Sequence, residues 1–176
     1  MTPNPAAWPT LPDLGTIARL QILAAAHRHA AYVETVIDRP FRSLWDEVAD
    51  IEKSVPTFDA TVHRLTVTER TNSGAPLRAT ATPFLFPFPI ALNIDLRSGW
   101  CLMNSRSYMV GFAAEPLTET TTRYAHLEGF SRRASSPIDL PLQLVQRAVA
   151  PFLRRHVRND IQGVQRLAEG RLGLKE

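Results

Sequence analysis

The longest regular pattern of apolar residues lies near the C-terminus. Between residues 138 and 168, apolar side chains recur every three or four positions and fall within one half of a helical wheel, while arginines and glutamines fill the other half. Pro151 interrupts this pattern and predicts a kink or a division into two helices. Gly170 predicts the end of the helix. A shorter pattern of the same period predicts a first helix from Asp13 to about His29.

Between these two helices the apolar positions alternate with polar ones, which indicates strands. A short amphipathic helix from Pro40 to Ile51 follows the first strand. Pro56 is expected to end this helical pattern before the second strand begins. Turns at residues 72–74 and 98–99 join neighbouring strands, so the five strands after this helix are expected to form an antiparallel meander. The expected strands are residues 31–38, 61–70, 77–82, 90–97, 100–113 and 120–130.

Residues 32–50 read YVETVIDRPFRSLWDEVAD, so that a strand ends before a proline and the following helix carries Trp45 and Asp50. This stretch and the order of the elements resemble the START-like helix-grip fold of the polyketide cyclase and lipid-transport superfamily, over about residues 31–168. The resemblance implies an α+β fold in which a curved antiparallel sheet wraps around a long C-terminal helix and encloses an apolar cavity. That family usually has six strands after the helices, and a break inside residues 100–113, or near the prolines at 87 and 89, would supply the sixth.

The resemblance also implies a division of the chain. Residues 1–30 would form an N-terminal arm with an extra helix, residues 31–170 the helix-grip domain and residues 171–176 a C-terminal tail. A chain of 176 residues with average apolar and charged content agrees with one folded domain.

The charge and the cysteine content limit which partners and which cellular compartment are expected. The net charge is +3, and the basic excess lies in residues 131–176, mainly on the polar half of the last helix, so we expect no nucleic-acid partner. Cys101 is the only cysteine, and no group of Cys and His residues has zinc spacing. Because the chain shows neither a signal peptide nor an apolar stretch long enough to cross a membrane, we expect a cytoplasmic protein. The pattern does not determine the oligomeric state.

A curved sheet with one helix across its mouth leaves an interior too wide for side chains to fill, and such a cavity suits an apolar ligand. We therefore expect the protein to bind or transport a hydrophobic small molecule, such as a lipid, a polyketide or an aromatic metabolite. The alternative is an enzyme of the polyketide cyclase/aromatase or dehydratase type that uses the same cavity. The sequence carries no catalytic signature, so no catalytic residue is assigned, and we expect neither a cofactor nor a metal.

The first candidate ligand-binding segment is the apolar loop PFLFPFPI, residues 83–90, which contains Phe84, Phe86 and Phe88. Its prolines exclude a central strand. One interpretation is an entrance to the cavity, or a patch that makes transient contact with a membrane or a partner. The other is that the rings fold back and complete the core, which we favour because aromatic side chains are usually buried.

The second candidate lies on the last helix, where Phe152, His156 and Asp160 share its apolar half. Facing a cavity, Asp160 would orient His156 as a general base or as an anchor for a ligand hydroxyl. The alternative is a mutually satisfied pair, or a pair at the rim that the kink at Pro151 turns towards solvent. We favour this alternative, because no nucleophile or metal motif accompanies the pair.

The third candidate is a group on the last two expected strands. Tyr124, His126 and Glu128 share one face, Arg106 and Tyr108 share another, and pairing of the strands would bring Arg106 near Glu128. Facing the cavity, these residues would suit acid–base steering of a polyketone chain into a ring; facing solvent, they would form an ordinary polar surface. Alternation does not decide between the faces, because the opposite residues are also apolar enough for a core. Convergence of His126, Glu128, His156 and Asp160 would separate an enzyme from a carrier.

Overall fold

The computed structural model describes residues 14–27, 29–72, 74, 76–84, 88–106, 108–130 and 140–170, with the side chains of the last helix described from Arg147 onward. Within these residues the helices and strands follow the expected order. They are α1 (Thr16–Ala26), β1 (Ala31–Ile37), α2 (Phe41–Val48), α3 (Ile51–Phe58), β2 (Val62–Arg70), β3 (Pro76–Pro83), β4 (Ile90–Arg97), β5 (Trp100–Asn104), β6 (Met109–Pro116), β7 (Thr122–Gly129) and α4 (Leu140–Ala168).

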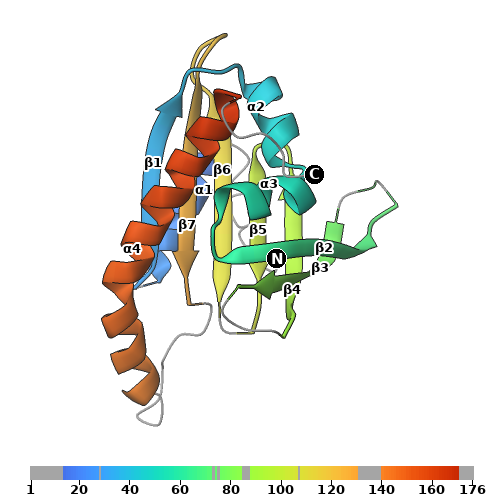
Figure 1. Ribbon diagram of the computed structural model, residues 1–176. Coiled ribbons are helices and arrows are strands. Elements are labelled where there is room, and N and C mark those ends of the chain that lie inside the picture. The colour runs from blue at the N-terminus through green and yellow to red at the C-terminus, as the bar shows by residue number, and fades with distance from the viewer. Residues whose placement is uncertain are drawn as a thin grey trace, which may run out of the picture.

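The strands form one antiparallel sheet in the order β1-β7-β6-β5-β4-β3-β2. Strands β2 to β7 follow one another as the predicted meander, and β1 closes the order by pairing with β7, the last strand of the chain. Figure 1 shows α4 lying across β1 and β7; on the same face, α2 contacts β6 and α3 contacts both α4 and β2. This α+β arrangement confirms the predicted helix-grip fold.

Helices cover both faces of the sheet around β7, and for this reason β7 is buried on both sides. The inner face packs against α2, α3 and α4 around Leu44, Trp45 and Phe112. The outer face packs against α1, whose Ile17 and Leu20 contact the cluster around Leu127. None of the helices in the described segments is both long and apolar enough to span a membrane.

The structure corrects the predicted sheet at residues 100–113. The expected single strand is two strands, β5 and β6, so six strands follow the helices instead of five. The backbone N–H of Ser105 donates to the carbonyl of Tyr108 at 2.8 Å, and the Ser105 hydroxyl accepts from the Tyr108 N–H at 3.0 Å. Because this turn is closed by a serine side chain, it needs neither glycine nor proline, and the alternating pattern runs through it unbroken.

The helices also differ from expectation. Pro56 lies inside α3 instead of ending the preceding helix, and the Asp59 N–H at the end of α3 donates to the carbonyl of Val55 at 2.8 Å. Pro151 lies within one continuous α4, so the helix is not divided in two. Gly170, with φ of +67°, ends α4 as predicted. The expected cap residue Asp13 lies outside the described residues, as do residues 1–12, 138–139 and 171–176.

Candidate functional site

An apolar pocket of about 420 Å³ lies between α3 and the inner face of strands β2 to β6. Most of its walls are aliphatic or aromatic, with contributions from Phe58, Leu65, Ala81, Met103 and Val110. Its polar lining residues are few and come from the ends of elements: Asp59, Thr61, Ser105, Arg106 and Tyr108. The pocket has the size and composition typical of sites for small apolar ligands.

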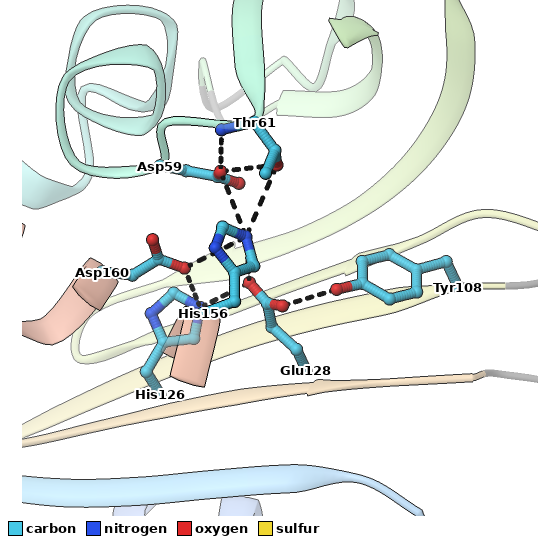
Figure 2. Close-up of polar contacts among 7 residues, drawn as sticks. All are labelled: Asp59, Thr61, Tyr108, His126, Glu128, His156 and Asp160. Atoms are coloured by element: carbon cyan, nitrogen blue, oxygen red, sulfur yellow. Dashed lines mark hydrogen bonds and ion pairs between the residues drawn. The ribbon is translucent and has the colours of Figure 1, made fainter. Parts of the chain in front are cut away.

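A buried group of titratable side chains adjoins this pocket and is called here the inner cluster: Asp59, His126, Glu128, His156 and Asp160 (Figure 2). Asp59 directly follows α3, His126 and Glu128 lie two residues apart on the inner face of β7, and His156 and Asp160 lie one turn apart on α4. No member is more than 9% exposed. Asp59 also lines the pocket, so the two sites are continuous.

Close packing of α3 against α4 brings Asp59 to the residues of α4. A Cβ atom at Gly163 would lie 2.9 Å from backbone atoms of Phe58, so only glycine permits this approach. The Asp59 carboxylate is then held in place by Thr61, whose N–H and hydroxyl both donate to Oδ1, at 2.8 and 2.7 Å. The same oxygen, Oδ1, also faces the imidazole of His156.

His156 lies at the centre of the inner cluster (Figure 2). Its Nε2 is 3.3 Å from Asp59 Oδ1 and 3.5 Å from both Glu128 Oε1 and Asp160 Oδ2. The Nε2 of His126 lies 3.5 Å from Glu128 Oε1 and 4.0 Å from Asp160 Oδ2. On the pocket side, the Tyr108 hydroxyl donates to Glu128 Oε2 at 2.5 Å.

Several polar atoms of this cluster are buried without a hydrogen bond. Within the described part of the chain, both ring nitrogens of His126, Glu128 Oε1, Asp160 Oδ2 and the nearby Tyr124 hydroxyl have no hydrogen-bond partner. Buried polar atoms in folded proteins are nearly always paired, and an unpaired one costs about 1 to 3 kcal/mol. As it stands, the cluster therefore lowers the stability of the fold.

The electrostatics of the cluster reflect crowded carboxyl groups. Burial, the charges of Asp59 and Glu128 and a hydrogen bond with Glu128 together raise the pKa of Asp160 to about 10. Burial also acts to raise the pKa of Asp59, but the imidazole of His156 and the donors of Thr61 outweigh it and leave that pKa below its ordinary value. Burial lowers the pKa of His156, yet its contact with Asp59 and the charge of Glu128 bring the net pKa above the ordinary value.

The same cluster contains the residues best suited to hold a metal. One donor atom each from Asp59, Glu128, His156 and Asp160 lies within 4.8 Å of all the others. Carboxylate oxygens and imidazole nitrogen are common ligands of divalent transition metals.

The structure decides which face of the last strand is inside. Tyr124, His126 and Glu128 face α4 and are fully buried. Arg106 does not approach Glu128 as expected; it is exposed in the turn between β5 and β6, and Val110 is the residue that pairs with Glu128. Tyr108 takes the expected role of Arg106 as the partner of Glu128. The expected pairing was wrong because the strand ends at Asn104, before Arg106 is reached.

The favoured interpretation of His156 and Asp160 was also wrong. They are neither at a solvent rim nor mutually satisfied, because Asp160 is 1% exposed and its Oδ2 accepts no hydrogen bond. They converge instead with His126 and Glu128. Phe152 is 61% exposed and stacks on the imidazole of His156, with ring centroids 6.1 Å apart.

The apolar loop is not part of the core at the residues that the structure describes. Phe84 and Phe88 are 63% and 75% exposed, which contradicts the favoured interpretation that their rings are buried. Phe86 lies outside the described residues. Neither exposed ring lines the pocket, but Pro83 and Ile90, at the two ends of the loop, do. The interpretation of the loop as an entrance stays a prediction.

Sequence reasoning missed Asp59 and Thr61. They belong to no periodic pattern, since Asp59 ends a helix and Thr61 precedes a strand. The spacing of an aspartate and a threonine two residues later is typical of a turn in which the carboxylate accepts from the backbone. That signal would have predicted the turn but not the cluster.

Comparisons with known proteins agree with the fold. No protein-family model and no curated protein matches this sequence significantly. Among solved structures, the ZhuI aromatase/cyclase from a Streptomyces species matches with a TM-score of 0.60 and 14% identity, over 81% of this chain and 94% of that one. A START superfamily protein from Mycobacterium smegmatis matches with a TM-score of 0.54 and 10% identity, over 81% of this chain and 96% of that one.

A third structure, of a protein from Thermus thermophilus, matches with a TM-score of 0.57 and 15% identity, over 80% of this chain and 97% of that one. At such identities the likeness concerns the fold alone. The chain therefore has the START-like helix-grip fold that its sequence predicted.

Proposed function

We propose that this protein binds an apolar small molecule that carries one polar group. The observation that supports this function is the pocket of about 420 Å³, with apolar walls and polar residues Asp59, Thr61 and Tyr108 at the side of the inner cluster. An apolar ligand body would contact Phe58, Leu65 and Met103. Its polar group would then face the hydroxyl and carboxylate groups, which would orient it.

Burial of an apolar ligand in the pocket favours binding even without a charged group to anchor the ligand. A ligand that buries about 300 Å² of apolar surface gains about 7 kcal/mol at about 25 cal/mol per Å². The gross gain alone corresponds to a Kd of about 10 μM, and the association and ordering costs weaken the affinity from there towards the millimolar range.

Filling the pocket tests the proposal. Ala81 is buried and lines the pocket, so Ala81→Phe should weaken the binding of a fluorescent apolar probe, anilinonaphthalene sulfonate, at least about tenfold. Leu77→Phe is the control, because Leu77 lies exposed on the same strand, β3, outside the pocket. Probe affinity is measured by fluorescence titration, and folding by the melting temperature. Equal affinity in both variants would contradict the proposal, and mass spectrometry of molecules that copurify would identify natural ligands.

A second candidate function is catalysis on the same ligand, of the cyclase, aromatase or dehydratase type. The convergence of His126, Glu128, His156 and Asp160 favours it, because proton donors and acceptors then lie beside the polar end of the pocket. For such an enzyme, His156→Gln should lower the turnover of a polyketone mimic about a hundredfold while probe affinity changes little. A wild-type protein without turnover would leave binding as the function.

A further inference from the structure

We infer that the inner cluster is a binding site for a divalent transition-metal ion, with Asp59, Glu128, His156 and Asp160 as its ligands. One donor atom from each of these side chains lies within 4.8 Å of the other three. The inference goes beyond the proposed function, because an ion would bind here whether or not the pocket holds an apolar ligand.

The spacing of the donors fits a single ion. Four ligands about 2.1 Å from an ion in tetrahedral geometry are about 3.4 Å from one another. The Nε2 atom of His156 lies 3.3 Å from the Asp59 carboxylate and 3.5 Å from those of Glu128 and Asp160. These three spacings are close to those between the ligands of one ion, and the oxygens of the three carboxyl groups lie within 4.8 Å of one another.

The unpaired atoms of the cluster point to a ligand independently of this spacing. Glu128 Oε1 and Asp160 Oδ2 belong to side chains that are 0% and 1% exposed, and neither atom has a hydrogen-bond partner in the described part of the chain. These are the same two oxygens that approach His156. A bound cation would satisfy both at once.

Charge balance favours a cation over a water molecule. Three carboxyl groups share a buried volume in which the imidazole of His156 pairs with Asp59, and no lysine or arginine forms an ion pair with any of the three within the described segments. Buried carboxylates are stable when they are paired with a positive charge or coordinate a metal. Because the set combines carboxylate oxygens with imidazole, it suits zinc, manganese or ferrous iron better than calcium, which takes oxygen ligands.

Neighbouring residues hold the donor carboxylates by hydrogen bonds, as they do around the ligands of a metal site. Thr61 donates two hydrogen bonds to Asp59, and Tyr108 donates to the Glu128 oxygen that faces away from His156. His126 lies 3.5 Å from the other Glu128 oxygen. Such outer contacts fix the orientation of ligating carboxylates, and their loss typically weakens metal binding by about 10- to 100-fold. If the pocket binds its ligand as proposed, an ion here would lie at the polar end, next to Asp59.

The test uses the full chain after removal of metals with EDTA and dialysis. We expect calorimetric titration with zinc or manganese to show one ion bound per chain, with a rise in melting temperature. The variants Asp160→Asn and His156→Gln should bind at least about 100-fold more weakly, because each removes a direct ligand. His63→Gln is the matched control, since His63 is exposed on β2 outside the cluster.

The apoprotein separates loss of binding from loss of folding. Asp160→Asn should melt no lower than the wild type in EDTA, because it removes one of the crowded carboxyl groups. The inference is overturned if the wild type binds no stoichiometric ion, or if His63→Gln loses as much affinity as Asp160→Asn. Because this titration contains no apolar probe, it fails or succeeds separately from the pocket test with Ala81→Phe.

Discussion

Two polar clusters lie on opposite faces of the same pair of strands, β1 and β7, and they are built differently. The outer cluster centres on Glu34 of β1, whose Oε1 accepts from Arg123 Nε at 3.0 Å and whose Oε2 accepts from Tyr32 at 2.8 Å and Gln21 at 3.0 Å. The side chain of Glu34 is 27% exposed. The inner cluster is buried, contains three carboxyl groups and leaves several of their neighbouring atoms unpaired.

The pKa values express the same difference. Burial acts to raise the pKa of Glu34, but the hydrogen bonds from Arg123 and Tyr32 outweigh it and bring that pKa below its ordinary value. At Asp160, burial and the neighbouring carboxyl groups act together and raise the pKa to about 10. The outer cluster thus stabilises the ionised form of Glu34, whereas the inner cluster destabilises the ionised form of Asp160. Strongly shifted pKa values of this kind cluster at functional sites.

The largest expected effect is a gain in stability when one carboxyl group of the inner cluster is removed. In EDTA, Asp160→Asn should raise the free energy of unfolding by about 2 kcal/mol, because an amide fits the same space without adding a third buried acid. Urea denaturation measures the change. Asp46→Asn, at an exposed acid on α2, is the control and should stay within about 0.5 kcal/mol of the wild type. A clear loss of stability in Asp160→Asn would mean that the carboxylate holds the fold together.

The next prediction, a smaller change in stability, compares two tyrosines whose hydroxyls each donate a hydrogen bond to a glutamate. Tyr108→Phe should cost about 1.5 kcal/mol, because it leaves a buried Glu128 oxygen without its donor. Tyr32→Phe should cost about 0.5 to 1 kcal/mol, since Glu34 keeps Arg123 and Gln21 and is partly exposed to water. Both variants lose one hydroxyl, so the comparison by denaturation is matched. A larger loss of stability in Tyr32→Phe than in Tyr108→Phe would show that water reaches the inner cluster.

The smallest effect concerns the pH dependence of the outer cluster. Because the folded pKa of Glu34 lies below its unfolded value of about 4.3, its contribution is present above that pH and disappears as the pH falls through the folded value. Glu34→Gln should therefore cost less than about 1 kcal/mol at pH 7 and still less at pH 3. Unfolding curves at both pH values, with and without added salt, measure this. An equal cost at both would indicate that the charge of Glu34 plays no part.

Much of the fold was predictable because local patterns report local structure. Residues 90–97 form β4 with the predicted bounds, and β1 differs from its expected range by one residue. The errors fall where one side chain replaces the usual turn signal, as Ser105 does between β5 and β6. Pro56 was misleading in the opposite sense, because the cost of its missing N–H is outweighed by the packing of Val55 and Phe58, on either side of it, in the core.

The candidate site was predictable only in part. His156 and Asp160 stood out because they occupy an otherwise apolar helix face, and this placement along α4 was correct. Their meeting with Asp59 depends on the approach of α3 to α4 at Gly163, which no pattern near Asp59 indicates. Contacts between residues about 100 positions apart are set by how elements pack, and periodicity carries no information on that scale.

The sequence by itself determined the elements, their order and the alternation of β7, because helix and strand periods follow from backbone geometry. Only the tertiary structure decided that Tyr124, His126 and Glu128 face inward. Both faces of β7 are covered, by α4 on one side and by α1 on the other, so the residues that point to either face are buried. The alternating pattern therefore agrees equally well with either face pointing inward. The docking of α4 and α3 places three carboxyl groups and two imidazoles together on one of those faces, and this long-range packing creates the candidate site.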